Sequence, residues 1–104
     1  MIGRVWKATA TPNGADAYCF HFEESVLPSL SSVDGYRGAY LMRRDEGEAT
    51  ELRVMTLWDS SDAISAFAGS DIDKAVVEPE ARAVLQTYDK QVTHYEVIVN
   101  TASG

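Results

Sequence analysis

The sequence predicts an α+β fold in which helices cover one face of a four-stranded antiparallel sheet. Four segments have the alternation of a strand, and the segments between them have helical periodicity. A short charged run containing a glycine joins the two middle strands, as expected of a hairpin. The length of 104 residues suits one modest core, so we expect a single domain spanning residues 1–104.

The first strand is expected over residues 2–10, where a Pro- and Gly-containing turn ends it. Asn13 can cap the helix that follows, since a short polar side chain accepts a hydrogen bond from the first turn. Tyr18 and Phe22 lie one helical turn apart and begin an apolar stripe. The Pro- and Ser-rich run 28–32 is expected to end this helix.

The central hairpin comprises a strand over about 36–44, a loop at 45–48 and a returning strand over 50–58. Alternation places Trp58 on one face of the returning strand and Leu57 on the other. Apolar side chains therefore lie on both faces near the end of this strand, which predicts that both are covered there.

The second half of the chain is expected to contain a broken helix and a last strand. Asp59 or Ser60 caps the helix, and a second short helical piece is predicted over 70–76. Pro79 fits the first turn of a further helical segment. Residues 92–100 alternate and are predicted to form the last strand.

This order of elements, β-α-β-β-α-β, is the ferredoxin-like split βαβ arrangement. Its helices lie on one face, so the other face of the sheet needs a cover. Met55, Leu57, Val92 and Ile98 are expected to make that face partly apolar. We therefore expect a homodimer in which two sheet faces pack together about a two-fold axis.

Composition excludes several classes of function. The chain has 9 Lys and Arg against 16 Asp and Glu and no basic run beyond Arg43-Arg44, so nucleic-acid binding is not expected. We expect no membrane association, because no apolar run approaches the ~20 residues that span a bilayer. The N-terminus lacks the apolar stretch of a signal peptide, so a cytoplasmic location is expected. Cys19 is the sole cysteine, which excludes an internal disulfide.

The run "TLWDSSDAISAFAGSDIDKAVVEPEARAVL" and the later "YDKQVTHYEVIV" resemble the antibiotic biosynthesis monooxygenase superfamily. The strand "GYRGAYLMRR" and the opening "MIGRVW" also fit, so the resemblance covers nearly the whole chain. It implies a dimeric α/β barrel with a pocket between sheet and helices in each subunit. Some members of the superfamily oxidise polyketide-type aromatic molecules with molecular oxygen and no cofactor, and others degrade haem.

The resemblance to the haem-degrading branch is incomplete. Trp58 matches a Trp that this branch carries at the end of its third strand. The branch also has a haem-ligating His on the following helix, and residues 67–77 contain none. Its Asn on the first strand has no counterpart among residues 6–8. Haem degradation is therefore not expected, and we expect neither a cofactor nor a metal site.

Two histidines are the candidate catalytic bases, since imidazole titrates close to neutral pH. His94 lies in the last strand, where it either faces the pocket or makes hydrogen bonds at the dimer interface. Alternation puts it opposite Tyr95, so it belongs to the interface if Tyr95 faces the helices. His21 lies beside the buried stripe of the first helix, either at the rim of a pocket or at a solvated edge.

An aromatic ligand would suit a chamber walled by aromatic rings. The candidate substrate-binding residues are Trp58, Tyr18, Phe22, Phe67 and Tyr95, with Arg37 to neutralise a phenolate or enolate. These rings can equally fill the core, and Arg37 can equally pair with an acid. Two functions follow: a cofactor-free monooxygenase of small aromatic or polyketide-like molecules, or a dimeric binding module without turnover.

Overall fold

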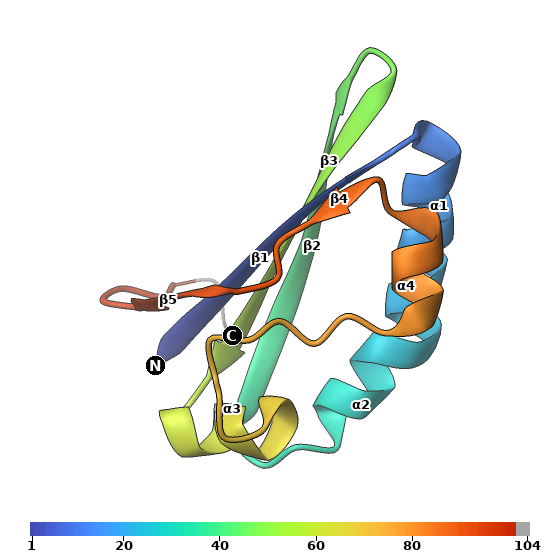
Figure 1. The fold of residues 1–104 in the computed structure, drawn as a ribbon. Helices are drawn as coiled ribbons and strands as arrows, with labels where there is room; N and C mark the ends of the chain where they lie inside the picture. Colours follow the sequence, from blue (N-terminus) through green and yellow to red (C-terminus); the bar gives the residue numbers. More distant parts are fainter. Residues whose placement is uncertain (102–104) are drawn as a thin grey trace.

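The computed structural model describes residues 1–101. A sheet carries all the helices on one side, as Figure 1 shows. The strands are β1 (Ile2–Ala10), β2 (Tyr36–Glu46), β3 (Ala49–Trp58), β4 (Thr87–Tyr88) and β5 (Thr93–Glu96). The helices are α1 (Pro12–His21), the π-helical turn η1 (Phe22–Val26), α2 (Leu27–Ser31), α3 (Ser61–Ala68) and α4 (Pro79–Val84).

The sheet is antiparallel, with β2 at one edge, then β3, then β1, and with β4 and β5 both paired to β1 at the other edge. This order confirms the ferredoxin-like prediction. The hairpin of β2 and β3 has an irregularity between Tyr36 and Gly38 and then pairs without a break down to Glu46 and Ala49, and its tip extends beyond the helices in Figure 1. None of the helices among residues 1–101 is long and apolar enough to cross a bilayer.

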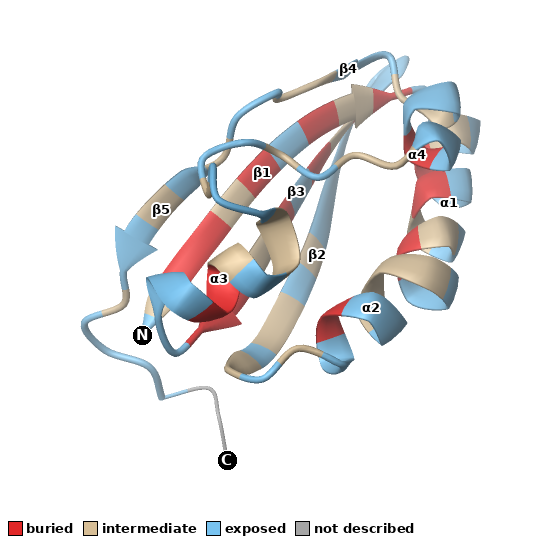
Figure 2. Cartoon of the chain, turned by 60° about the horizontal axis from the view of Figure 1, so that its bottom comes forward, coloured by how far each residue is buried: buried red, intermediate tan, exposed pale blue. Residues whose placement is uncertain are grey.

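Strand β3 follows the predicted alternation. Leu52, Val54, Thr56 and Trp58 are buried under the helices, and Leu57 on the opposite face is buried too. Figure 2 shows the buried residues of β1 and β3 beneath the helix layer and the largely exposed edge strand β2.

Helix α1 begins two residues earlier than predicted. Thr11, not Asn13, is the N-cap: its Oγ1 accepts a hydrogen bond from the Gly14 amide at 3.1 Å. Pro12 then occupies the first helical position, where its missing amide hydrogen costs nothing. At α3 the prediction of Asp59 or Ser60 resolves to Ser60, whose Oγ accepts from the Ala63 amide at 3.2 Å.

The short helix predicted over 70–76 does not form. This segment instead lies in extended and turn conformations and pairs with the chain before β5. The Ala75 amide donates to the Lys90 carbonyl at 2.9 Å, and the Val92 amide donates to the Asp73 carbonyl at 2.7 Å. These tertiary hydrogen bonds outweigh a weak helical pattern.

The last strand is shorter than predicted, and its faces are the reverse of those we expected. It covers Thr93–Glu96, and the register pairs His94 with Arg4 and Tyr95 with Gly3. Directly opposed residues of antiparallel strands point to the same face. Because Arg4 is buried under the helix layer, His94 lies on the covered face, while Tyr95 lies on the open one.

We define the open face as the side of the sheet that no described helix covers. Tyr40, Met42 and Tyr95 are exposed on it, and Met55 is half-buried. Val92, which we expected there, instead packs against the core beneath the helices. Ile98, also expected there, is almost fully exposed and follows β5 outside the sheet.

Candidate functional site

A cavity of about 60 Å³ lies between the covered face of the sheet and the helices. It is situated where two clusters of buried side chains meet, one centred on β1 and α1 and the other on Trp58 and α3. Its lining residues are Arg4, Trp6, Tyr18, His21, Phe22, Val26, Leu30, Val54, Thr56, Phe67, Val76, Val77, Glu78, Ala81 and Val92. Typical ligand sites measure ~300–1,000 Å³, so the space in this conformation is small for a ligand site.

Aromatic rings form much of the wall. The ring centroids of Trp6 and Tyr18 are 5.6 Å apart, and those of Tyr18 and Phe22 are 6.2 Å apart. The indole nitrogen of Trp6 donates to the Asp89 carbonyl at 2.8 Å, which fixes the ring. Phe67 closes the chamber from α3. These spacings are within the range that aromatic pairs prefer, so the rings of the wall support one another.

The π-helical turn η1 keeps one side of the long helical rod on the cavity. Tyr18, Phe22, Val26 and Leu30 are four residues apart and all line it. In a regular α-helix of 3.6 residues per turn, such a series drifts steadily around the axis. The Leu27 amide donates to the Phe22 carbonyl, a wider i to i+5 loop, which turns the series back toward the sheet.

Arg4 supplies a buried positive charge at the cavity wall, with 5% of its surface exposed. Its Nη1 donates to the Ile72 carbonyl, and its Nη2 donates to the Lys74 carbonyl at 2.9 Å. Burial lowers the pKa of the Arg4 guanidinium, and the nearby Asp73 carboxylate partly offsets that effect. An arginine nevertheless stays protonated in proteins, so the wall carries a full positive charge.

His94 touches Arg4 but does not line the cavity. Arg4 Nη1 lies 3.1 Å from His94 Nε2, and a guanidinium can only donate, so Nε2 is the acceptor. The imidazole is therefore neutral with its proton on Nδ1, which faces Asp73 Oδ1 at 3.3 Å. Burial first, and then the Arg4 charge, lower the pKa of His94, although Asp73 acts in the opposite direction.

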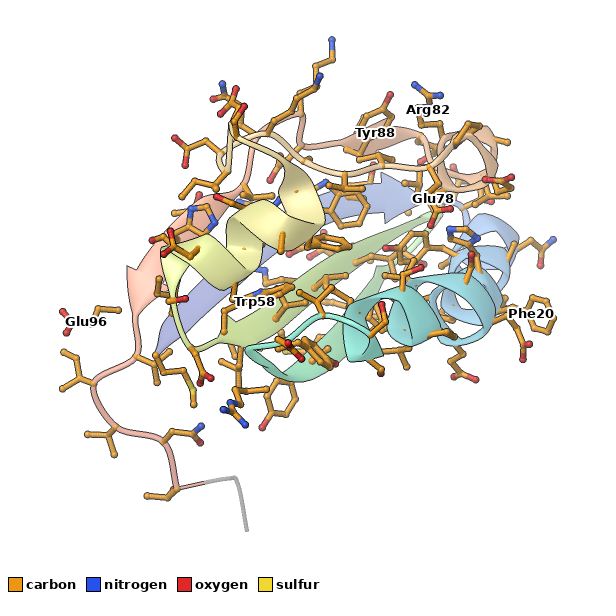
Figure 3. All side chains as sticks on the ribbon, turned by 90° about the horizontal axis from the view of Figure 1, so that it is seen from below. Phe20, Trp58, Glu78, Arg82, Tyr88 and Glu96 are labelled. Carbon is orange, nitrogen blue, oxygen red and sulfur yellow. The ribbon has the colours of Figure 1, made fainter. Side chains whose placement is uncertain are left out.

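His21 does line the cavity. Its Nε2 is buried and makes no hydrogen bond to any of residues 1–101, while Glu78 Oε1 lies 3.5 Å away. Figure 3 shows Glu78 at the start of α4, on the side that faces α1. The Tyr18 ring is 6.1 Å from the imidazole, and burial raises the pKa of the Tyr18 phenol. A base, a carboxylate and a neutral phenol thus meet at one end of the chamber.

Trp58 lies behind the wall rather than on it. Its side chain is fully buried beneath α3, and its Nε1 donates to Thr56 Oγ1 at 2.7 Å (Figure 3). Its ring lies 5.7 Å from both Phe67 and Tyr36. Thr56 and Phe67 line the cavity, so Trp58 supports two wall residues without reaching the space itself.

Two candidate binding residues lie away from the cavity. Arg37 is exposed and binds the Asp59 carboxylate with both arms of its fork, including Nε to Oδ1 at 2.7 Å. This hydrogen bonding lowers the pKa of Asp59. Tyr95 is on the open face. Among the candidate residues, the structure therefore brings together Tyr18, His21, Phe22 and Phe67 at the cavity.

Sequence reasoning missed Arg4, Trp6 and Glu78. Arg4 and Trp6 share the covered face of β1 with Ala8 and Ala10. A charged residue at an inward position of an otherwise apolar strand face could therefore have indicated a functional residue, because such a charge is buried only with partners. Glu78 gave no such signal, because its role depends on the approach of α4 to α1.

Comparisons with known proteins agree with this fold. The family model for antibiotic biosynthesis monooxygenases matches residues 1–79. Rv0793 of Mycobacterium tuberculosis superposes with a TM-score of 0.64 at 18% identity, covering 97% of this chain and 98% of that one. No curated protein sequence matches the chain.

Two structural neighbours are an oxygenase and a haem degrader. A variant of SnoaB, a cofactor-independent oxygenase of Streptomyces nogalater, has a TM-score of 0.64 at 11% identity, covering 98% of this chain and 97% of that one. The haem degrader MhuD of Mycobacterium tuberculosis, with two haems bound, has a TM-score of 0.61 at 20% identity, covering 98% and 100%. Likeness at these identities concerns the fold alone.

Proposed function

Because the chain belongs to the antibiotic biosynthesis monooxygenase family, we propose that it is a cofactor-independent monooxygenase of a small aromatic or polyketide-like molecule. The observation that carries this proposal is the position of His21. Its buried Nε2 has no hydrogen-bond partner among residues 1–101, and the imidazole borders an aromatic chamber that also holds the Arg4 charge.

The chemistry needs a base, a stabilised anion and exclusion of water. His21 accepts the proton of a phenol-like hydroxyl, and Glu78, 3.5 Å from Nε2, stabilises the resulting imidazolium. Arg4 stabilises the negative charge left on the substrate. The electron-rich anion then passes an electron to molecular oxygen. For a naphthol, one oxygen atom ends in the quinone carbonyl, and the other leaves as water with the two hydrogens removed.

The aromatic walls position the substrate and keep water out. Trp6, Tyr18 and Phe67 supply faces on which a flat ring can stack, each contact contributing about 0.5–1.5 kcal/mol beyond the buried area. A low-dielectric chamber also strengthens the attraction between Arg4 and an anion.

Haem is not the ligand that we propose. Its iron needs an axial ligand from the protein. Residues 67–77, which bear the ligand in the haem-degrading branch that the sequence resembles, contain no His. We therefore propose no step through haem.

Oxygen uptake with a panel of naphthols and hydroxynaphthoates tests the proposal. We expect uptake with quinone formation by the wild type, and a loss of about 10²-fold or more in His21→Gln, as for removal of a general base. Arg44→Gln is the control, because Arg44 is exposed and pairs with Glu46 away from the cavity. Equal rates in wild type and His21→Gln would refute the role of His21.

The second candidate function is a binding module without turnover. The small volume of the cavity favours it, since little space is available for both a ring and oxygen. Ligand binding that produces no oxygen uptake with any member of the panel would establish this alternative and overturn the monooxygenase.

We also propose a homodimer formed through the open face. Tyr40, Met42 and Tyr95 expose large apolar groups there, and the neighbouring Met55 is half-buried. Soluble proteins rarely leave such a face uncovered. Sedimentation velocity at micromolar concentration is expected to give the mass of a dimer, and a monomer would refute the proposal.

A further inference from the structure

The roof of the cavity is an irregular segment, residues 69–78, which we call the roof segment. It connects α3 to α4 and passes across β1 in Figure 2. Val76, Val77 and Glu78 face the cavity from it. Between α3 and α4 it forms turns and a single bridge, so it has fewer local hydrogen bonds than the helices on either side.

Arg4 is the side chain that holds the roof segment to the sheet. Two of its nitrogens bind the carbonyls of Ile72 and Lys74, two residues apart along the roof segment. Its third contact is His94, which in turn faces Asp73 of the roof segment. Among residues 1–101, every polar contact of this buried guanidinium therefore involves the roof segment or leads back to it.

The cavity must enlarge to hold a ring-sized ligand, and the roof segment is the part of its lining with the fewest hydrogen bonds. The cavity of about 60 Å³ is several times smaller than typical ligand sites. The sheet and α1 are held by continuous hydrogen-bond ladders, whereas the roof segment depends on Arg4 and a few backbone contacts. Local opening takes place where such contacts are fewest.

Moving the roof segment would leave the Arg4 charge uncompensated. The two carbonyls would depart together with the Asp73 carboxylate, which is the acid that acts on the Arg4 pKa. A buried charge that loses its partners is strongly destabilised. An anionic oxygen on the ligand would restore the lost contacts with the geometry that a guanidinium fork prefers.

We propose that Arg4 is a latch that exchanges the Ile72 and Lys74 carbonyls for an anionic oxygen, so that the cavity opens for aromatic acids in preference to neutral aromatics. The proposal deepens the proposed function, because it names the class of ligand. It rests on the proposed function for one point, namely that the cavity is the ligand site. Neutral ligands of the same shape leave the charge uncompensated and bind more weakly.

Anaerobic calorimetry with 1-hydroxy-2-naphthoate and its neutral amide tests the ligand class without turnover. We expect the wild type to bind the naphthoate about 10-fold or more tighter, the range for a hydrogen-bonded charge. In Arg4→Gln the preference should fall to within about 3-fold, and in the surface control Arg44→Gln it should persist. No preference in the wild type, or its full retention in Arg4→Gln, would overturn the proposal.

Amide hydrogen exchange tests the latch in the wild type, so the test does not depend on the folding of a variant. The Ala75 and Val92 amides report on the roof segment, because their partners are Lys90 and Asp73. We expect them to exchange about 10-fold faster with naphthoate bound, while the amides of β3 are unchanged. If hydrogen exchange of both amides is unchanged or slower on binding, the ligand does not replace the carbonyl partners of Arg4, and the latch is refuted.

The outcomes separate this inference from the proposed function. Naphthoate preference and roof opening without oxygen uptake would refute the monooxygenase and leave the latch standing. Oxygen uptake by the wild type, together with equal affinity for the naphthoate and its neutral amide, would support the monooxygenase and refute the latch.

Discussion

Replacement of Trp58 by Phe separates a supporting role from a ligand-binding role. Trp58 is fully buried, its indole nitrogen donates to Thr56 Oγ1 at 2.7 Å, and it does not line the cavity. Trp6, by contrast, is a wall residue with its own hydrogen bond to the Asp89 carbonyl. Trp58→Phe and Trp6→Phe are therefore matched changes on the two sides of the wall.

The expected cost of Trp58→Phe is about 2 kcal/mol in the free energy of unfolding. The lost hydrogen bond accounts for about 1 kcal/mol. The void left by the smaller ring adds about 1 kcal/mol. Thr56→Val leaves the indole N–H buried without its acceptor, which costs about 1–3 kcal/mol. The double variant should lose about 1 kcal/mol less than the sum, because neither polar group is then stranded.

Urea denaturation of the four proteins in this cycle measures the coupling, and calorimetry with 1-hydroxy-2-naphthoate measures binding. We expect Trp58→Phe to change the naphthoate affinity by less than about 3-fold and Trp6→Phe to weaken it further. Strictly additive losses would refute the hydrogen-bond argument. A large loss of affinity in Trp58→Phe with unchanged stability would place Trp58 in the ligand site.

Three further predictions concern stability. Since the folded-state pKa of His94 lies below its unfolded value near 6.5, the stability contributed by His94 is complete above about pH 6.5 and is lost as the pH falls through the folded-state pKa. Urea midpoints should therefore drop from pH 7 to pH 5 less in His94→Gln than in wild type, and equal slopes would contradict this. Ser60→Ala should cost about 1 kcal/mol by removing the acceptor for the Ala63 amide, and an unchanged urea midpoint would exclude the cap. Gly35→Ala should lower the thermal unfolding midpoint more than Gly47→Ala. Both glycines have positive φ, but a Cβ at Gly35 would lie 2.6 Å from the Ala63 Cβ, whereas the space at Gly47 is open.

The sheet was predictable because its signals are local. Alternation in β1 and β3 and the charged loop between β2 and β3 determine those elements without any distant contact. The roof segment shows the opposite situation. Its residues have a weak helical pattern. Their conformation is determined by the hydrogen bond between Ala75 and Lys90 and by those of Arg4, and both partners are remote in the sequence.

The faces of the last strand could not be predicted from alternation alone. Val92 and His94 alternate with Thr93 and Tyr95, and both sets mix apolar with polar groups. Only the register with β1, which places His94 opposite Arg4, decides which set is covered. The lining of the chamber was predictable in part, through Tyr18, Phe22 and Phe67, because the apolar stripe of a helix indicates which side is buried.

The wide turn at Phe22–Val26 gives the helical rod one place where the chain can be shortened. Its i to i+5 hydrogen bond accommodates one residue more than a regular helical turn would need. Deleting exposed Glu24 would remove this extra residue, so the backbone could re-form as a continuous α-helix with Val26 and Leu30 still on the side of the cavity. A deletion within α1 would instead rotate every later residue of the rod by about 100° and carry Leu30 away from the cavity. The same loss of one codon would therefore spare the ligand space at this turn and reshape it one turn earlier.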